Sequence, residues 1–428
     1  MADFALAPKE AANIALNAYF ALKDWSLKQP TAGVESRGKV QDLVLGSGDT
    51  KGVFKTNSSV GKSFPGAQLG QIFSGTTGWN TASGFGYVLH FERGGQRHAV
   101  IAVRGTRPEL GWYDIGTDFR FAHTGFGDFG RVHKGFANAF GSILPQLQRE
   151  QGAILAADVI HCIGHSLGGA IATLIAGHYA ALNRPVRLYT FGSPRVGYRD
   201  AHQAFERRIG KENIFRTAHN RDPITMIATY PYKHVLAPYT DPNNFTLNSP
   251  NASISMDNHD MEAYARSLRL ADNWSAVRGL AAACDHSNSK LAQALMADSS
   301  MSWFKKLTLS TLAALLTLFE DVLRAAARGF YDAVTGVDVL AAVICDGVKL
   351  LGEVGERLKY LLRLAARWAE IHVANEAALT DTVIRAILQA MTSRINQVGI
   401  AALQRAASLL RPAPLLIAGS LLISASAL

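Results

Sequence analysis

Short apolar runs alternate with helical stretches over much of the chain, and this alternation predicts the main architecture. Five runs have the length and the β-branched or aromatic content of strands: 86–92, 98–103, 158–163, 186–191 and 214–218. The first two flank Arg93-Gly94-Gly95-Gln96, a turn sequence that predicts a β-hairpin. The later runs are interleaved with helices, which is typical of a mostly parallel sheet with helices on its faces. The predicted fold class is therefore α/β.

The segment before this sheet has a different pattern. Apolar residues near a 3.6-residue period, with Pro8 in the first turn, predict a helix over 5–25. Residues 28–84 contain clusters of Gly, Ser and Thr without sustained periodicity, so we expect them to be mainly loops. Both stretches are assigned, as an N-terminal helix and a loop-rich segment over 1–85, to a first domain over 1–285.

The C-terminal third lacks strand signals. Ala, Leu, Arg and Glu dominate from about residue 274 to 410, which predicts an all-helical C-terminal region over 286–428 after a polar cluster at 285–289. Its most apolar stretches, 307–319 and 415–428, are too short for a membrane span. They either pack as a helical bundle or lie in the lipid headgroup layer beside basic residues, which are Lys305, Lys306, Lys359, Arg363 and Arg367.

Composition narrows the class of protein. The proportions of hydrophobic and charged residues, 48% and 18% of 428, exclude a mainly disordered chain. The net charge of +9 is spread along the sequence rather than concentrated, so it argues against nucleic-acid binding. It is consistent with an affinity for anionic phospholipid surfaces.

Cysteine usage and the N-terminal sequence bear on the compartment. Cys162, Cys284 and Cys345 are widely separated, so neither a disulfide framework nor a zinc site is expected. Charged residues within 1–29 interrupt the apolar core that a signal peptide needs. We expect a protein made in the cytoplasm, with export, if any, by a route that needs no signal peptide, and with peripheral rather than spanning contact with membranes.

The strongest chemical signal is Gly164-His165-Ser166-Leu167-Gly168, which matches the pattern G-x-S-x-G. A predicted strand precedes it and an apolar helical stretch follows it, so the serine stands on a tight turn between strand and helix. Such a nucleophile elbow exposes the serine hydroxyl at the sheet edge and directs a helix N-terminus at developing negative charge. Ser166 is therefore the predicted nucleophile.

A nucleophilic serine needs a base and an acid that orients the base. In this architecture the acid is expected in a loop after a later strand, and Asp222 follows the run 214–218 at that place. Asp200 and Asp241 are weaker candidates, because Asp200 lies in a helical segment and Asp241 follows no strand. Asp222 is the predicted acid.

Four histidines after the serine are candidates for the base. His286 and His372 lie in the helical region, and His234 lies in a predicted strand over 232–235. His259 lies in a loop that feeds a helix over 261–271, and a loop above the carboxyl end of the sheet suits a base best. We favour His259 and keep His234 as the alternative.

An acyl-transfer site also needs donors for the oxyanion. The backbone N–H of Leu167 is the expected donor from the elbow. The second is expected in a loop after an earlier strand, where the run 98–103 leads into Thr106. We therefore predict an oxyanion hole made by Leu167 and Thr106. No metal or organic cofactor is expected for this chemistry.

Several motifs in this order resemble the class 3 lipases, an α/β-hydrolase family that includes fungal triacylglycerol lipases. The matching stretches are 102–106, 112–119, 132–136, 163–170, 190–197, 221–223 and 232–235. The resemblance implies an α/β-hydrolase fold, with Ser166, Asp222 and His259 as catalytic triad and Thr106 and Leu167 as oxyanion hole. It also implies that His234 is a non-catalytic histidine near the end of the sheet.

The chain departs from the fungal members, which are secreted and rich in disulfides, and its helical region has no counterpart in them. A class 3 lipase without a signal peptide and with an added helical region is similar in layout to lipase effectors of bacterial type VI secretion. That similarity implies export to a target-cell envelope and an immunity or secretion-carrier protein as partner. A housekeeping intracellular lipase fits the same sequence.

These features together predict a lipase or phospholipase that cleaves acyl esters of lipids. A non-lipolytic esterase for small soluble esters is the alternative, and residues 107–116 bear on the choice because they hold Leu110, Trp112 and Tyr113 where family lids lie. A non-enzymatic binding or pore-forming protein is a third possibility, against which the complete set of predicted catalytic residues argues.

Overall fold

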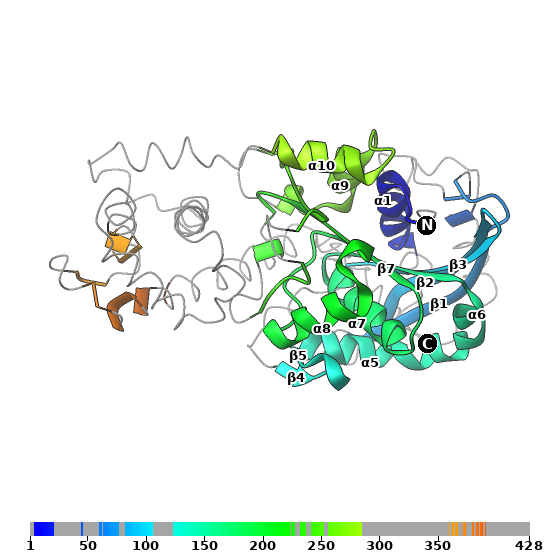
Figure 1. The fold of residues 1–428 in the computed structure, drawn as a ribbon, viewed down its shortest axis with the longest axis horizontal. Helices are drawn as coiled ribbons and strands as arrows, with labels where there is room; N and C mark the ends of the chain where they lie inside the picture. The colour runs from blue at the N-terminus through cyan, green and yellow to red at the C-terminus, as the bar shows by residue number, and fades with distance from the viewer. Residues whose placement is uncertain are drawn as a thin grey trace, which may run out of the picture.

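A seven-stranded sheet forms the centre of the computed structural model, which describes residues 4–20, 44–45, 60–61, 63–76, 82–105, 123–222, 224–226, 232–236, 241–251, 256–284 and scattered positions between 359 and 390 (Figure 1). Its strands are β1 (Gln68–Thr76), β2 (Ala82–Arg93), β3 (Gln96–Val103), β6 (Val159–His165), β7 (Val186–Phe191), β8 (Ile214–His219) and β9 (Asn244–Leu247), in that spatial order. The pairs β1–β2 and β2–β3 are antiparallel, and every later pair is parallel. A two-stranded sheet of β4 (His123–Gly125) and β5 (Arg131–His133) lies apart from it in the hydrogen-bonding pattern.

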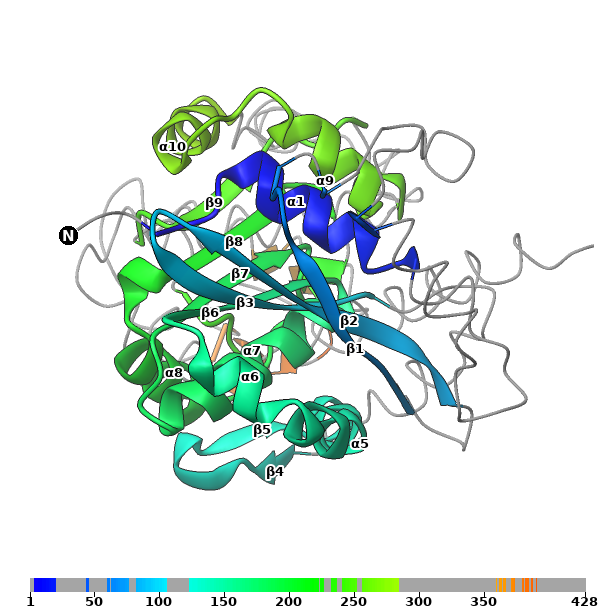
Figure 2. The ribbon, with the colours of Figure 1, turned by 90° about the vertical axis from the view of Figure 1, so that its right-hand side faces the viewer.

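Helices cover both faces of the central sheet (Figure 2). One face carries α5 (Lys134–Arg149), α6 (Gln151–Ala156), α7 (Leu167–Ala181) and α8 (Arg199–Ile209). The other carries α1 (Pro8–Asn17), α9 (Met261–Leu268) and α10 (Trp274–Ala282). This layered arrangement, with the mostly parallel sheet at its centre, is the α/β-hydrolase architecture that the sequence predicted.

Two apolar cores follow from the two-residue period of the strands. In β3, the buried side chains of Ile101 and Val103 pack with the core around α5 and α7, whereas Val100 and Ala102 pack with the core around α1 and α9. Strands that are buried on both faces read as continuous apolar runs, as parallel strands of this class do. All seven residues of β6 are buried for this reason.

Strand β1 corrects one prediction. The segment 28–84 was expected to be mainly loops, but Gln68–Thr76 pairs antiparallel with β2 along the edge of the sheet. Its sequence contains Gln, Gly and Ser with only Leu69, Ile72 and Phe73 buried as large apolar side chains, and two register shifts interrupt its pairing. An irregular edge strand of this composition carries little periodic signal, because only part of it contacts the core.

Other predicted elements differ in extent. The helix expected over 5–25 is α1 over Pro8–Asn17, followed by the turn residues Ala18 and Tyr19. Residues 21–43 lie outside the described part of the chain. The strand expected over 232–235 is wrong, since only Lys233 pairs there, in an isolated bridge with Gly197. The helix expected over 261–271 is α9, which ends at Leu268. Of the predicted helical region over 286–428, only scattered positions between 359 and 390 are described.

Within the described residues, no helix is both long and apolar enough to cross a lipid bilayer. The predicted stretches 307–319 and 415–428 lie outside the described residues.

Candidate active site

Ser166 occupies a strained turn between β6 and α7. Its backbone has φ 57° and ψ −132°, a region that residues with a side chain rarely adopt. The Ser166 N–H donates to Phe191 O at 2.9 Å, which ties the turn to the end of β7. A Cβ on Gly164 would lie 2.1 Å from Gly168 O, and one on Gly168 would lie 2.4 Å from Arg104 O. Both glycines are therefore required for the turn to close, and the turn places the serine side chain above the sheet edge.

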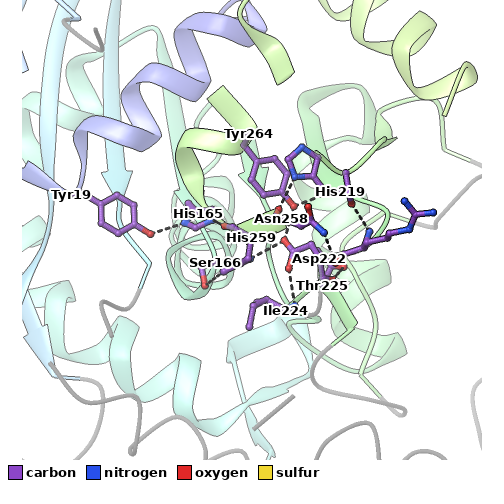
Figure 3. Close-up of polar contacts among 12 residues, drawn as sticks. Tyr19, His165, Ser166, His219, Asp222, Ile224, Thr225, Asn258, His259 and Tyr264 are labelled. Atoms are coloured by element: carbon purple, nitrogen blue, oxygen red, sulfur yellow. Dashed lines mark hydrogen bonds and ion pairs between the residues drawn. The ribbon is translucent and has the colours of Figure 1, made fainter. Parts of the chain in front are cut away.

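The three residues predicted for catalysis lie in one hydrogen-bonded row (Figure 3). His259 Nε2 is 2.8 Å from Ser166 Oγ, and His259 Nδ1 is 2.8 Å from Asp222 Oδ2. Asp222 follows β8, and His259 lies between the 3₁₀ turn Met256–Asn258 and α9. Because the carboxylate only accepts, Nδ1 carries the proton in this contact and Nε2 is left as an acceptor for the serine proton.

The alternative histidine lies in another environment. His234 Nε2 is 3.1 Å from a guanidinium nitrogen of Arg216, which can only donate, so this ring nitrogen accepts a bond within the fold. Burial, followed by the charge of Arg216, holds the pKa of His234 well below its usual value. The structure therefore does not bring His234 to Ser166, and it favours His259 between the two. His286 lies outside the described residues.

The two weaker carboxylate candidates serve structural contacts. Asp200 is in the first turn of α8 and pairs with Arg131 at 3.0 Å. Asp241 Oδ1 accepts from the N–H of Asn243 at 3.1 Å. Neither contact involves a candidate catalytic residue.

Asp222 is fully buried and satisfied by several donors. Oδ1 accepts from the N–H of Ile224 at 2.8 Å, and Oδ2 accepts from the hydroxyl of Tyr264 at 2.6 Å in addition to His259. A buried carboxylate needs such donors in order to remain charged. Burial and the neighbouring Asp222 carboxylate raise the pKa of Tyr264 well above its usual value, so that its hydroxyl stays a donor.

Tyr264 is a functional candidate that sequence reasoning missed. It is held in place by His219. The backbone N–H of His219 donates to Tyr264 Oη at 2.9 Å, and the imidazole ring stacks on the tyrosine ring with 4.0 Å between centroids. The imidazole of His219 is itself held by Asn258 O at 2.7 Å. In the sequence Tyr264 lies within the helix predicted over 261–271, and nothing local marks its hydroxyl as a partner of Asp222.

We expect Tyr264→Phe to lower kcat by about tenfold while Asp222 keeps its two other bonds, which corresponds to about 1.4 kcal/mol of lost transition-state stabilisation. The removed bond is one of two that hold Oδ2, so the His259 ring loses part of its orientation rather than its partner. Steady-state kinetics on a soluble short-chain ester would show the fall in kcat. Full activity of the variant would exclude this role for Tyr264.

Gly192, at the end of β7, leaves room for the pair that faces Ser166. It has φ +56°, and a Cβ there would lie 2.8 Å from Asp222 Oδ2 and 3.0 Å from His259 Nδ1. Any side chain at this position would push the acid and the base apart. The requirement comes from both backbone conformation and lack of space.

The predicted oxyanion hole is described only in part. Leu167 is the first residue of α7, so its N–H is among those that no carbonyl of the same helix can accept. The positive end of the helix dipole lies at the same place. Thr106 and the apolar stretch 107–116 lie outside the described residues. The part of the chain that is described contains no cluster of three or more His, Cys, Asp or Glu side chains arranged to hold a metal ion.

Part of the sequence also matches the model of a known protein family. Residues 100–231 match the family model described as Lipase (class 3). This segment contains the elbow serine and Asp222, while His259 follows it.

Named relatives resemble parts of this chain. Secreted mono- and diacylglycerol lipase A of Penicillium camembertii is 30% identical over 200 residues, which are 44% of this chain and 62% of that protein. Secreted mono- and diacylglycerol lipase 1 of Fusarium solani is 30% identical over 155 residues, 34% of this chain and 44% of that protein. Toxin TseL of Vibrio cholerae is 35% identical over 100 residues, 23% of this chain and 15% of that protein. The chain thus spans less than two thirds of the length of each of these relatives.

A solved structure of the Yarrowia lipolytica LIP2 lipase aligns with a TM-score of 0.39 at 18% identity, and the alignment covers 57% of this chain and 79% of that one. The fold assignment rests instead on the strand order and helix layers of the chain itself.

Buried histidines should make the folded protein sensitive to mild acid. Burial lowers the pKa of the His133 ring from the usual 6.5 to about 4. Burial also lowers the pKa of four further rings, those of His161, His165, His219 and His234. Below pH 6.5 the unfolded chain therefore binds more protons than the folded one. The free energy of unfolding should be largest above that pH and should fall on acidification by up to about 1.4 kcal/mol per pH unit for each such ring. We expect a lower urea midpoint at pH 5.5 than at pH 7.5, and equal midpoints would contradict the prediction.

Proposed function

We propose that this protein is a serine carboxylic ester hydrolase that cleaves acyl esters of lipids, with Ser166 as nucleophile, His259 as base and Asp222 as the acid that orients it. The observation that carries the proposal is the row of two 2.8 Å contacts from Ser166 through His259 to Asp222, which begins on a strained strand-to-helix turn. The match of residues 100–231 to class 3 lipases supports it independently.

In the first half of the reaction, His259 Nε2 takes the hydroxyl proton as Ser166 Oγ forms a bond to the ester carbonyl carbon. The carbonyl oxygen becomes an oxyanion, for which the Leu167 N–H at the start of α7 is the proposed donor. Thr106 is proposed as the second donor from its place in the sequence. The intermediate collapses when the carbon–oxygen bond to the alcohol breaks and the alcohol leaves with the proton from His259.

In the second half, water replaces the alcohol. His259 takes a proton from water, the resulting hydroxide attacks the acyl carbon, and the Ser166 Oγ–carbon bond breaks as His259 returns the proton to Oγ. The carboxylic acid is released and the free enzyme is restored. Asp222, buried and with Oδ2 on Nδ1, stabilises the imidazolium that exists transiently in each half.

Lipids are the proposed substrate class because the named relatives from Penicillium camembertii and Fusarium solani are mono- and diacylglycerol lipases. The test is incubation of the full chain with mixed phospholipid and triglyceride emulsions, followed by lipid extraction and mass spectrometry. Released fatty acid together with the matching deacylated lipid would support the proposal and name the headgroup. Hydrolysis of soluble short-chain esters alone would favour the non-lipolytic esterase instead.

The similarity to Toxin TseL favours a second, finer proposal: an enzyme that attacks lipids in the envelope of another bacterium. An immunity protein and a secretion carrier would then be its protein partners, and the helical region over 286–428 would provide contact with the membrane surface. Expression in a bacterial host with and without an export leader separates the two roles. Growth arrest only with the leader, abolished by Ser166→Ala, supports the effector role, and equal growth of both strains supports a housekeeping lipase.

A further inference from the structure

One phenolic hydroxyl contacts two parts of the candidate site that are far apart in the sequence. Tyr19 follows helix α1 by two residues, and its Oη is 2.6 Å from His165 Nδ1 (Figure 3). The same oxygen is 3.1 Å from the backbone nitrogen of Gly105. Gly105 ends the described stretch after β3, and His165 precedes the elbow serine. A Cβ on Gly105 would lie 2.6 Å from Tyr19 Oη and 2.7 Å from Ser166 Cβ, so the hydroxyl lies beside the nucleophile.

His165 extends the contact to a third part of the site. Its Nε2 is 2.7 Å from the backbone oxygen of His259, and the two imidazole rings lie 4.6 Å apart between centroids. The backbone oxygen can only accept, so Nε2 carries the proton. Burial, followed by the proximity of His259, holds the pKa of His165 well below its usual value, and the ring is therefore neutral.

The donors and acceptors of this chain have only one consistent assignment. With Nε2–H donating to His259 O, a neutral ring presents Nδ1 as an acceptor, so the hydroxyl of Tyr19 must donate to it. The hydroxyl oxygen is then an acceptor for the Gly105 N–H. Every proton runs in one direction, from the end of β3 to the loop that carries His259.

We propose that Tyr19 is a positioning residue of the active site, whose hydroxyl links the end of β3 to the nucleophile elbow and, through His165, to the backbone of His259. This inference rests on the proposed esterase function. Gly105 directly precedes Thr106 in the sequence. The Tyr19 hydroxyl therefore also holds the residue next to the proposed second oxyanion donor. Shifts of about 1 Å in the positions of reacting groups change reaction rates strongly. Because the Tyr19 hydroxyl links three backbone segments of the site, its loss should affect the positions of all three.

The N-terminal segment is anchored firmly enough to serve this purpose. The Leu6 N–H donates to Tyr189 Oη at 3.0 Å, and Trp274 Nε1 donates to Leu6 O at 2.8 Å. The carboxylate of Glu10 accepts hydrogen bonds from both terminal nitrogens of Arg93, at 2.7 and 3.1 Å. These contacts attach the helix to β7, α10 and β2, so Tyr19 approaches the site from a fixed support.

The experiment compares Tyr19→Phe with Tyr87→Phe in the full chain. The hydroxyl of Tyr87 also donates a hydrogen bond to the N-terminal helix, at Ile14 O, but Tyr87 is not part of the site. For Tyr19→Phe we expect kcat on a soluble p-nitrophenyl ester to fall about tenfold with KM changed less than about twofold, and labelling by a fluorophosphonate probe to slow by a similar factor. Tyr87→Phe should keep the wild-type kcat, while its melting temperature falls at least as far as that of Tyr19→Phe.

A double-mutant cycle with His165→Gln separates positioning from packing. Glutamine can keep the donor to His259 O but has no acceptor at the Nδ1 position, so Tyr19→Phe should cost less than about threefold in that background.

Equal losses in both backgrounds, unchanged kcat in Tyr19→Phe, or equal kcat in the two tyrosine variants would each overturn the inference. If Tyr19→Phe does not fold, His165→Gln is compared with His165→Asn, which cannot reach His259 O, and equal kcat values overturn it. Wild-type protein that neither hydrolyses esters nor reacts with the probe refutes the proposed function itself.

Discussion

Replacing Ser166 by alanine is expected to lower the rate of ester hydrolysis by about 10⁴- to 10⁶-fold, because nucleophile, base and acid act as one unit and the loss of the nucleophile removes the acyl-enzyme route. The fold should be unaffected. The Ser166 hydroxyl hydrogen-bonds to His259 Nε2, and alanine can occupy the elbow at the same backbone angles with the strain that serine already has. The variant should also fail to react with a fluorophosphonate probe.

A serine on α5, away from the elbow, is the matched control for this measurement. Ser142 lies on α5, where its hydroxyl donates to Ala139 O at 2.7 Å. Ser142→Ala should retain wild-type kinetics and full probe labelling. If Ser166→Ala still hydrolysed esters at a rate near that of the wild type, the nucleophile would have been assigned to the wrong residue.

The second large effect is expected for Asp222→Asn, with a loss of about 10⁴-fold in kcat. The two carboxylate oxygens differ in a way that determines how an amide would be placed. Oδ1 faces the N–H of Ile224, which can only donate, so an amide NH₂ at that position would oppose another donor. Oδ2 faces the hydroxyl of Tyr264 and the imidazole of His259, and both of these can accept instead.

The amide nitrogen is therefore expected to face His259. Its N–H would require Nδ1 to be an acceptor, which moves the ring proton to Nε2 and directs it at Ser166 Oγ. A ring in that tautomer cannot take the serine proton. The loss should appear in kcat with little change in melting temperature, since the size and the number of hydrogen bonds are kept.

Asp200→Asn is the control for Asp222→Asn, because Asp200 contacts Arg131 on the surface and no site residue. It should leave kcat unchanged. Comparable activity in Asp222→Asn and Asp200→Asn would show that the buried carboxylate does not orient the base.

Strand ends and turn chemistry are local, and these are the features that the sequence by itself determined. Gly164 and Gly168 around Ser166 mark a strand-to-helix turn, because only residues without Cβ allow the backbone to approach there. The position of Asp222 follows from the strand before it. For the base, local pattern left two histidines open and favoured His259 because of its loop.

The tertiary structure decided what depends on contacts between distant segments. His234 is separated from the site because Arg216, 18 residues away, occupies its Nε2. Tyr264 and Gly192 matter only because α9 and the end of β7 meet at Asp222, and Tyr19 meets His165 across 146 residues of sequence. Strand β1 exists through pairing with β2 despite a weak pattern of its own. A sequence states which groups each residue offers, but hydrogen-bond partners are chosen by packing, since a buried donor or acceptor must find whatever complement the surrounding elements bring within about 3 Å.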